Sequence, residues 1–91
     1  MSENQISNDE QLKKQQEFLG RAYKGILKHL SDAGGTLKMG VLHEYSLNKY
    51  FIQHERFSKM LEMFVDKGYV VFDWETQTIT LTDTGRNYFS S

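Results

Sequence analysis

The sequence predicts an α+β domain that is mainly helical, with three helices followed by a β-hairpin and a short last helix. Apolar residues recur at helical spacing before the pair Gly34-Gly35, and again before the pair Lys67-Gly68. Two runs rich in β-branched and aromatic residues, 69–72 and 78–81, then follow as candidate strands. A chain of 91 residues provides one such domain with a modest core.

The composition narrows the class of protein. The chain carries 11 basic and 12 acidic residues, a balance that counts against a nucleic-acid-binding domain unless the basic residues gather on one surface. The absence of cysteine excludes disulfides and thiolate metal sites and fits a cytoplasmic protein. No apolar run approaches the roughly 20 residues of a membrane span, and the N-terminus lacks the pattern of a signal peptide.

Residues 1–7 are polar and are expected to form a disordered tail, which leaves residues 8–91 as a single domain. The first helix is expected over residues 8–31, because a helical face is formed by Leu12, Leu19, Tyr23, Ile26, Leu27 and Leu30. Its weakly apolar beginning, residues 12–18, either packs against a second copy of the chain or is a solvated extension. Since a core of this size is marginal, a homodimer is expected.

Thr36-Leu37 is expected to form a very short strand before the second helix, at residues 38–45. The turn is placed at Ser46-Leu47-Asn48, because serine and asparagine offer acceptors to the free amides of the next helix. The expected helix-turn-helix is the central motif of the domain, and the other segments support it.

The third helix is expected over residues 48–67, with one apolar face made of Leu47, Tyr50, His54, Phe57, Leu61 and Phe64. Ile52 does not fit this face. The alternative is a helix at residues 46–51 followed by a separate helix from His54. Gly68 suits a left-handed residue just past the helix end.

The hairpin is expected over residues 69–82. Pairing Val70 with Leu81 also pairs Phe72 with Ile79 and places four apolar side chains on one face. This register leaves a four-residue loop at positions 74–77. Thr82 can then cap the last helix, at residues 83–89, whose aromatic residues would pack back on the first helix.

Three segments carry a resemblance to a known family. Residues 38–48 (KMGVLHEYSLN) resemble the "K-x-x-I-L-x-x-x-x-L-N" start of small archaeal winged-helix DNA-binding proteins, several of them dimeric. Residues 67–70 (KGYV) are similar to their "K-G-L-I" passage into the wing, and residues 81–89 (LTDTGRNYF) resemble their "L-T-x-x-G-x-x-F-L" end. The resemblance implies a winged helix-turn-helix that binds double-stranded DNA as a homodimer.

If the chain binds DNA, the N-terminal half of the third helix enters the major groove. Arginine suits guanine, asparagine and glutamine suit adenine, and lysine suits guanine or phosphate. The candidate DNA-binding residues are Lys38, His43, Asn48, Lys49, Gln53, Arg56 and Lys59. The alternative is that they form only the solvated face of an amphipathic helix.

The expected wing tip argues for another kind of partner. Asp73 and Glu75 flank Trp74 and would repel a phosphate backbone. Trp74 is therefore a candidate protein contact, since aromatic residues are enriched in binding hot spots, unless it covers apolar surface at the sheet edge. The alternative function is a winged-helix adaptor that binds another protein through this tip or through the first helix.

Catalytic chemistry is the least supported class. The histidines His29, His43 and His54 lack metal-ligand spacing, and no nucleophile–base pair or phosphate loop is present. We expect neither an enzyme nor a metal or cofactor site. The expected function is that of a small cytoplasmic winged-helix protein whose binding to duplex DNA, sequence-specific or architectural, serves transcriptional control or DNA organisation.

Overall fold

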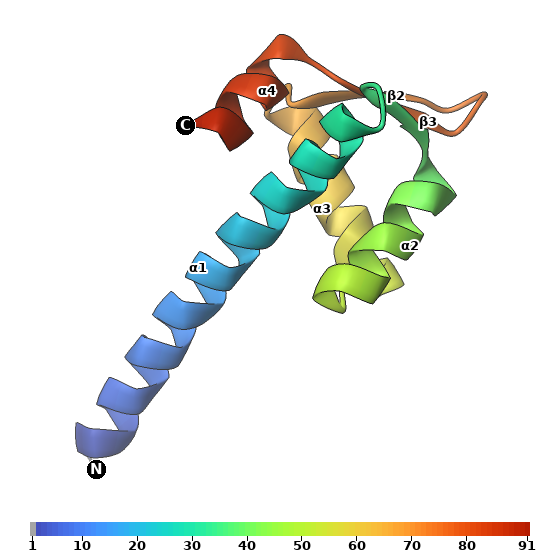
Figure 1. The fold of residues 1–91 in the computed structure, drawn as a ribbon. Helices are drawn as coiled ribbons and strands as arrows, with labels where there is room; N and C mark the ends of the chain where they lie inside the picture. Colours follow the sequence, from blue (N-terminus) through green and yellow to red (C-terminus); the bar gives the residue numbers. More distant parts are fainter. Residues whose placement is uncertain (1) are drawn as a thin grey trace.

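A computed structural model describes the backbone of residues 2–91 and the side chains from residue 11 onward. Over this range the fold is α+β and mainly helical, as the sequence predicts, with four helices and a three-stranded antiparallel sheet (Figure 1). The elements in chain order are α1 (Ser2–Asp32), β1 (Thr36–Lys38), α2 (Met39–Tyr50), α3 (His54–Asp66), β2 (Val70–Asp73), β3 (Thr78–Leu81) and α4 (Asp83–Ser90).

The long helix α1 covers the core with its C-terminal half and projects away from the other elements with its N-terminal half (Figure 1). Its buried residues are Ala22, Ile26, Leu27 and Leu30, whereas Leu12 is 57% exposed. The helix begins at Ser2, so the expected disordered tail at residues 1–7 is wrong for residues 2–7; Met1 lies outside the described residues. No glycine or proline interrupts residues 2–19, which explains the continuous helix.

The predicted turn between the second and third helices is wrong. Ser46 lies inside α2, where its buried hydroxyl donates to the Leu42 carbonyl at 2.8 Å instead of capping a new helix. The chain turns five residues later, at residues 51–53, and α3 begins at His54. The single helix expected over 48–67 is therefore wrong, and the alternative start at His54 is confirmed. Ile52 is buried in the turn, which explains why it fits neither helix face.

The sheet has the strand order β1-β3-β2, and its hairpin is predicted correctly. Val70 pairs with Leu81 and Phe72 with Ile79, and a four-residue loop joins the strands. The short strand β1 pairs with β3 in antiparallel register. Gly68 has a φ of 76°, which confirms the left-handed end of α3. The Gly68 amide donates to the Val65 carbonyl, and the next amide donates to the Phe64 carbonyl.

Thr82 joins the end of the hairpin to α4. Its hydroxyl accepts from the Gly85 amide at 3.0 Å, which is the predicted helix cap, and donates to the Tyr69 carbonyl at 2.9 Å. The Thr82 amide also donates to the Tyr69 carbonyl, at 3.0 Å. Helix α4 then packs on α1, with Lys24 Nζ lying 5.5 Å from the centre of the Tyr88 ring.

The core lies between the C-terminal half of α1, α3 and the inner face of the sheet. Phe64 of α3 is fully buried and meets the Tyr23 ring edge to face, with 5.6 Å between the ring centres. Gly25 of α1 lets the Tyr50 hydroxyl of α2 approach the helix backbone, because an added Cβ would collide with that hydroxyl. In residues 2–91 we find no helix that has both the length and the apolar character needed to cross a bilayer.

Candidate nucleic-acid interface

Five of the seven candidate DNA-binding residues lie at one end of the α2–α3 pair. The structure places Asn48 and Lys49 in the last turn of α2, Gln53 at the cap position of α3, and Arg56 and Lys59 in its first two turns. All five side chains are exposed, and within residues 11–91 none forms a hydrogen bond or an ion pair. Donors of three kinds are thus free on a short stretch of surface.

The other two candidates have contacts within the fold. Lys38 is exposed, but its Nζ donates to the Thr76 carbonyl at 2.8 Å and so links the start of α2 to the hairpin loop. His43 packs on the Phe57 ring, with 4.9 Å between the ring centres, and stands edge to face with His54. Its Nε2 is buried without a partner among the described residues. Neither side chain is free to reach a ligand without giving up these contacts.

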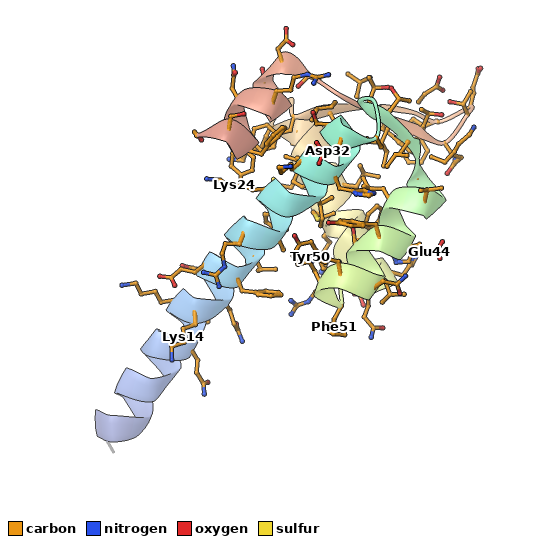
Figure 2. The ribbon with its side chains drawn as sticks, in the orientation of Figure 1. Lys14, Lys24, Asp32, Glu44, Tyr50 and Phe51 are labelled. Atoms are coloured by element: carbon orange, nitrogen blue, oxygen red, sulfur yellow. The ribbon has the colours of Figure 1, made fainter. Side chains whose placement is uncertain are left out.

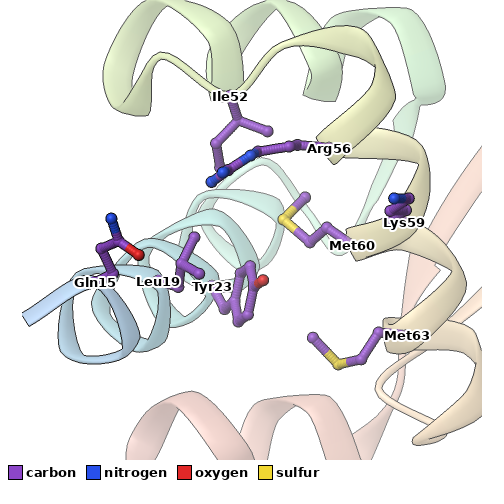
Figure 3. A pocket seen from close by; sticks show the side chains of 8 residues that line it. All are labelled: Gln15, Leu19, Tyr23, Ile52, Arg56, Lys59, Met60 and Met63. Atoms are coloured by element: carbon purple, nitrogen blue, oxygen red, sulfur yellow. The ribbon is translucent and has the colours of Figure 1, made fainter. Parts of the chain in front are cut away.

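Arg56 lies on the side of α3 that faces α1. It lines a cavity of about 380 Å³ that we call the α1–α3 cavity (Figure 3). Figure 3 shows Met60 and Met63 pointing from α3 toward Tyr23 of α1, while Arg56 extends across the end of the cavity beside Ile52. The cavity is lined by Gln15, Leu19, Tyr23, Ile52, Arg56, Lys59, Met60 and Met63.

Charge is divided along this part of the chain. Residues 48–59 carry three basic side chains and one acidic one, Glu55. Residues 60–77, which form the rest of α3, β2 and the hairpin loop, carry four acidic side chains and one basic one, Lys67. The N-terminal end of α3 has no side-chain cap on its free amides, and this positive dipole end lies at the same turn as the negative C-terminal end of α2. Basic side chains are therefore concentrated at the α2–α3 turn, and acidic side chains on the rest of α3 and the first half of the hairpin.

Phe51 is a residue at this site that the sequence pattern did not single out. It follows the last residue of α2 with φ 59° and ψ 30°, a left-handed conformation that a bulky side chain rarely adopts. In Figure 2, Tyr50 points from α2 toward α1, whereas Phe51 points away from the other elements. Phe51 is 81% exposed. The available sequence signal was the misfit of Ile52, which marks the turn.

Replacing Phe51 by glycine is expected to raise the free energy of unfolding by about 0.5–1 kcal/mol. Glycine adopts the left-handed conformation without strain, which stabilises the folded state by about 1–2 kcal/mol. Part of this gain is offset because glycine has greater conformational entropy in the unfolded chain. Urea unfolding followed by circular dichroism measures the change. Phe51→Ala is the control, because it removes the ring but keeps the Cβ. If alanine stabilises as much as glycine, exposure of the ring rather than backbone strain is responsible.

Tyr45 of α2 is half-buried, and the centre of its ring lies 6.2 Å from that of Tyr50. Burial and the neighbouring Tyr50 raise the pKa of Tyr45, so its hydroxyl stays neutral over the physiological range. Among the described residues no group of three or more histidine, aspartate or glutamate side chains is placed to hold a metal ion. The five candidate residues at the α2–α3 turn offer amide, ammonium and guanidinium donors and three positive charges.

Comparisons with protein-family models, with curated proteins and with solved structures found no match for this chain.

Proposed function

We propose that this protein binds double-stranded DNA as a winged helix-turn-helix, with α2 and α3 as the helix pair and the N-terminal half of α3 in the major groove. The observation that carries the proposal is the group of five exposed side chains at the α2–α3 turn, which have no partner among the side chains of residues 11–91. Their types match base edges and phosphates, and a recognition helix of this kind reads bases with its N-terminal residues. Regulation of transcription is the corresponding biological role.

The charge division supports a particular orientation on DNA. The surface of residues 48–59 would contact the duplex, with Lys49, Arg56 and Lys59 on phosphate or guanine and Asn48 and Gln53 on base edges. The hairpin, with Asp73 and Glu75 at its tip, would stay clear of the backbone phosphates. Lys38 and His43 would support the helix pair rather than touch DNA.

A homodimer is part of the proposal, and α1 is the element that supports it. Leu12 is 57% exposed and continues the helix face of Leu19, Tyr23 and Ile26 beyond the region that the rest of the chain covers. Isolated helical segments of this length are marginal in water, so a covering partner would stabilise the projecting half of α1. A second copy packed along this face would present two α3 helices to the duplex, about 34 Å apart if they read successive turns.

A DNA titration over a salt series tests the proposal. A fluorescent duplex of random sequence is titrated with the full chain, and the mass in solution is measured at the same protein concentrations. Three phosphate-binding cations per protomer predict that the logarithm of affinity falls with the logarithm of salt at a slope of about −3, or about −5 for a dimer. Absence of binding at about 50 mM salt, or binding without salt dependence, would contradict DNA binding.

A further inference from the structure

A second hollow lies on the other side of α3, between this helix and the hairpin. It has a volume of about 530 Å³, which falls within the range of ligand pockets, roughly 300–1,000 Å³. Its apolar walls come from Leu61 and Val65 of α3 and from Phe72 and Trp74 of the hairpin. We call it the α3–hairpin groove.

Two of the four apolar residues that form the walls of the groove are exposed, whereas Leu61 is buried and Phe72 is half-buried. Trp74 is 78% exposed and Val65 is 42% exposed. The Trp74 ring stands edge to face on the Phe72 ring, with 4.7 Å between the centres, so it is held beside the groove. An apolar surface of this kind, centred on a tryptophan, is typical of a binding site for another protein.

Acidic side chains surround these walls. Glu62 and Asp66 line the groove from α3, and Asp73 and Glu75 flank Trp74 in the sequence. The Asp73 carboxylate accepts the Glu75 amide at 2.9 Å, which fixes the loop beside the tryptophan. Of the side chains that the structure describes, no basic one lines the groove. In the part of the chain with described side chains, none of these four carboxylates forms an ion pair.

We propose that the α3–hairpin groove binds a polypeptide segment that presents bulky apolar side chains flanked by lysine or arginine. The apolar side chains would fill the groove against Val65 and Trp74, where burial removes apolar surface from water. The basic residues would face Glu62 and Asp66, and this charge complementarity selects the partner and speeds association. The same carboxylates repel phosphates, so this surface is distinct from the DNA surface of residues 48–59 and does not depend on it.

The test uses the emission of Trp74, the single tryptophan of the chain. The full chain is titrated with a synthetic peptide of alternating lysine and leucine pairs, and separately with the same peptide carrying glutamate in place of lysine. The lysine peptide is expected to shift the emission to shorter wavelength and to protect Trp74 from acrylamide quenching, with a dissociation constant below about 1 mM. The glutamate peptide is expected to have no effect.

Matched variants locate the binding surface. Val65→Ser is expected to weaken lysine-peptide binding about tenfold, because it removes most of one buried apolar side chain. Val71→Ser is the control, since Val71 is 60% exposed on the same hairpin but does not line the groove. Glu62→Gln combined with Asp66→Asn is expected to weaken binding about threefold and to reduce its salt dependence, whereas Glu44→Gln on α2 changes neither.

Four results would overturn the proposal. The first is equal binding of the two peptides, and the second is an equal effect of Val65→Ser and Val71→Ser. The third is protection of Trp74 by duplex DNA but not by the lysine peptide, which would assign the groove to the nucleic-acid surface. The fourth is an emission shift that follows protein concentration alone, which would assign the groove to a second copy of the chain. Circular dichroism of each variant confirms that it is folded.

Discussion

Replacing Gly85 by alanine is expected to lower the free energy of unfolding by about 3 kcal/mol. An added Cβ at this position would collide with the Tyr69 carbonyl oxygen and approach Leu81 Cδ1 to 2.7 Å. The carbonyl cannot retreat freely, because it accepts hydrogen bonds from both the amide and the hydroxyl of Thr82. The methyl group would therefore separate α4 from the hairpin or break the cap that begins α4.

Gly20→Ala is the matched control for this prediction. Gly20 also lies inside a helix, but nothing stands within 4 Å of its added Cβ. Helix propensity alone favours alanine there, so Gly20→Ala is expected to raise the free energy of unfolding by about 0.5–1 kcal/mol. Urea unfolding of the two variants measures both changes. If Gly85→Ala instead raises the free energy of unfolding, the prediction is wrong, and α4 and the hairpin can move apart at little cost to accommodate the methyl group.

The elements that were predicted correctly depend on neighbours close in the sequence. The hairpin register follows from alternation in two adjacent runs, and pairing Val70 with Leu81 satisfies every apolar position at once. The Thr82 cap and the left-handed Gly68 also depend on backbone groups within a few residues. Local chemistry of this kind can be inferred from the sequence without knowledge of the tertiary fold.

The α2–α3 turn could not be predicted in the same way. Ser46 and Asn48 favour a helix start by their chemistry, but the hydroxyl of Ser46 instead bonds inside α2, where the core buries it. The actual turn contains Phe51, a residue that disfavours the left-handed conformation. Tertiary packing, with Ile52 inserted into the core, therefore overrides the local preferences at this point.

The exposure of the candidate site residues could be predicted from the sequence, but their contacts with distant parts of the chain could not. Exposure of Asn48, Lys49, Gln53, Arg56 and Lys59 follows from polar spacing on the helices. The contact between Lys38 and Thr76 joins residues 38 positions apart, and sequence spacing gives no signal for it. The α3–hairpin groove likewise appears only when α3 and the hairpin are placed side by side.

Removing both Lys49 and Arg56 is expected to weaken binding to duplex DNA by at least about tenfold at low salt. Each cation is exposed and unpaired among the described residues, so alanine breaks no hydrogen bond or ion pair there. If both cations neutralise phosphates, the salt slope per protomer decreases by about two. Anisotropy titrations of the double variant over the same salt series measure both effects.

Lys13→Ala combined with Lys67→Ala is the control, because it changes the net charge equally but at the projecting half of α1 and at the end of α3. Equal losses of affinity in the two double variants would show that binding depends on overall charge and that the α2–α3 turn is not the DNA-binding site.

The variant Arg56→Lys distinguishes a contact of Arg56 with guanine from a contact with phosphate. Lysine keeps the charge but lacks the paired donors that fit guanine, so a guanine contact predicts an unchanged salt slope with relaxed sequence preference. A phosphate contact predicts that both properties stay unchanged, since a lysine ammonium binds phosphate as a point charge.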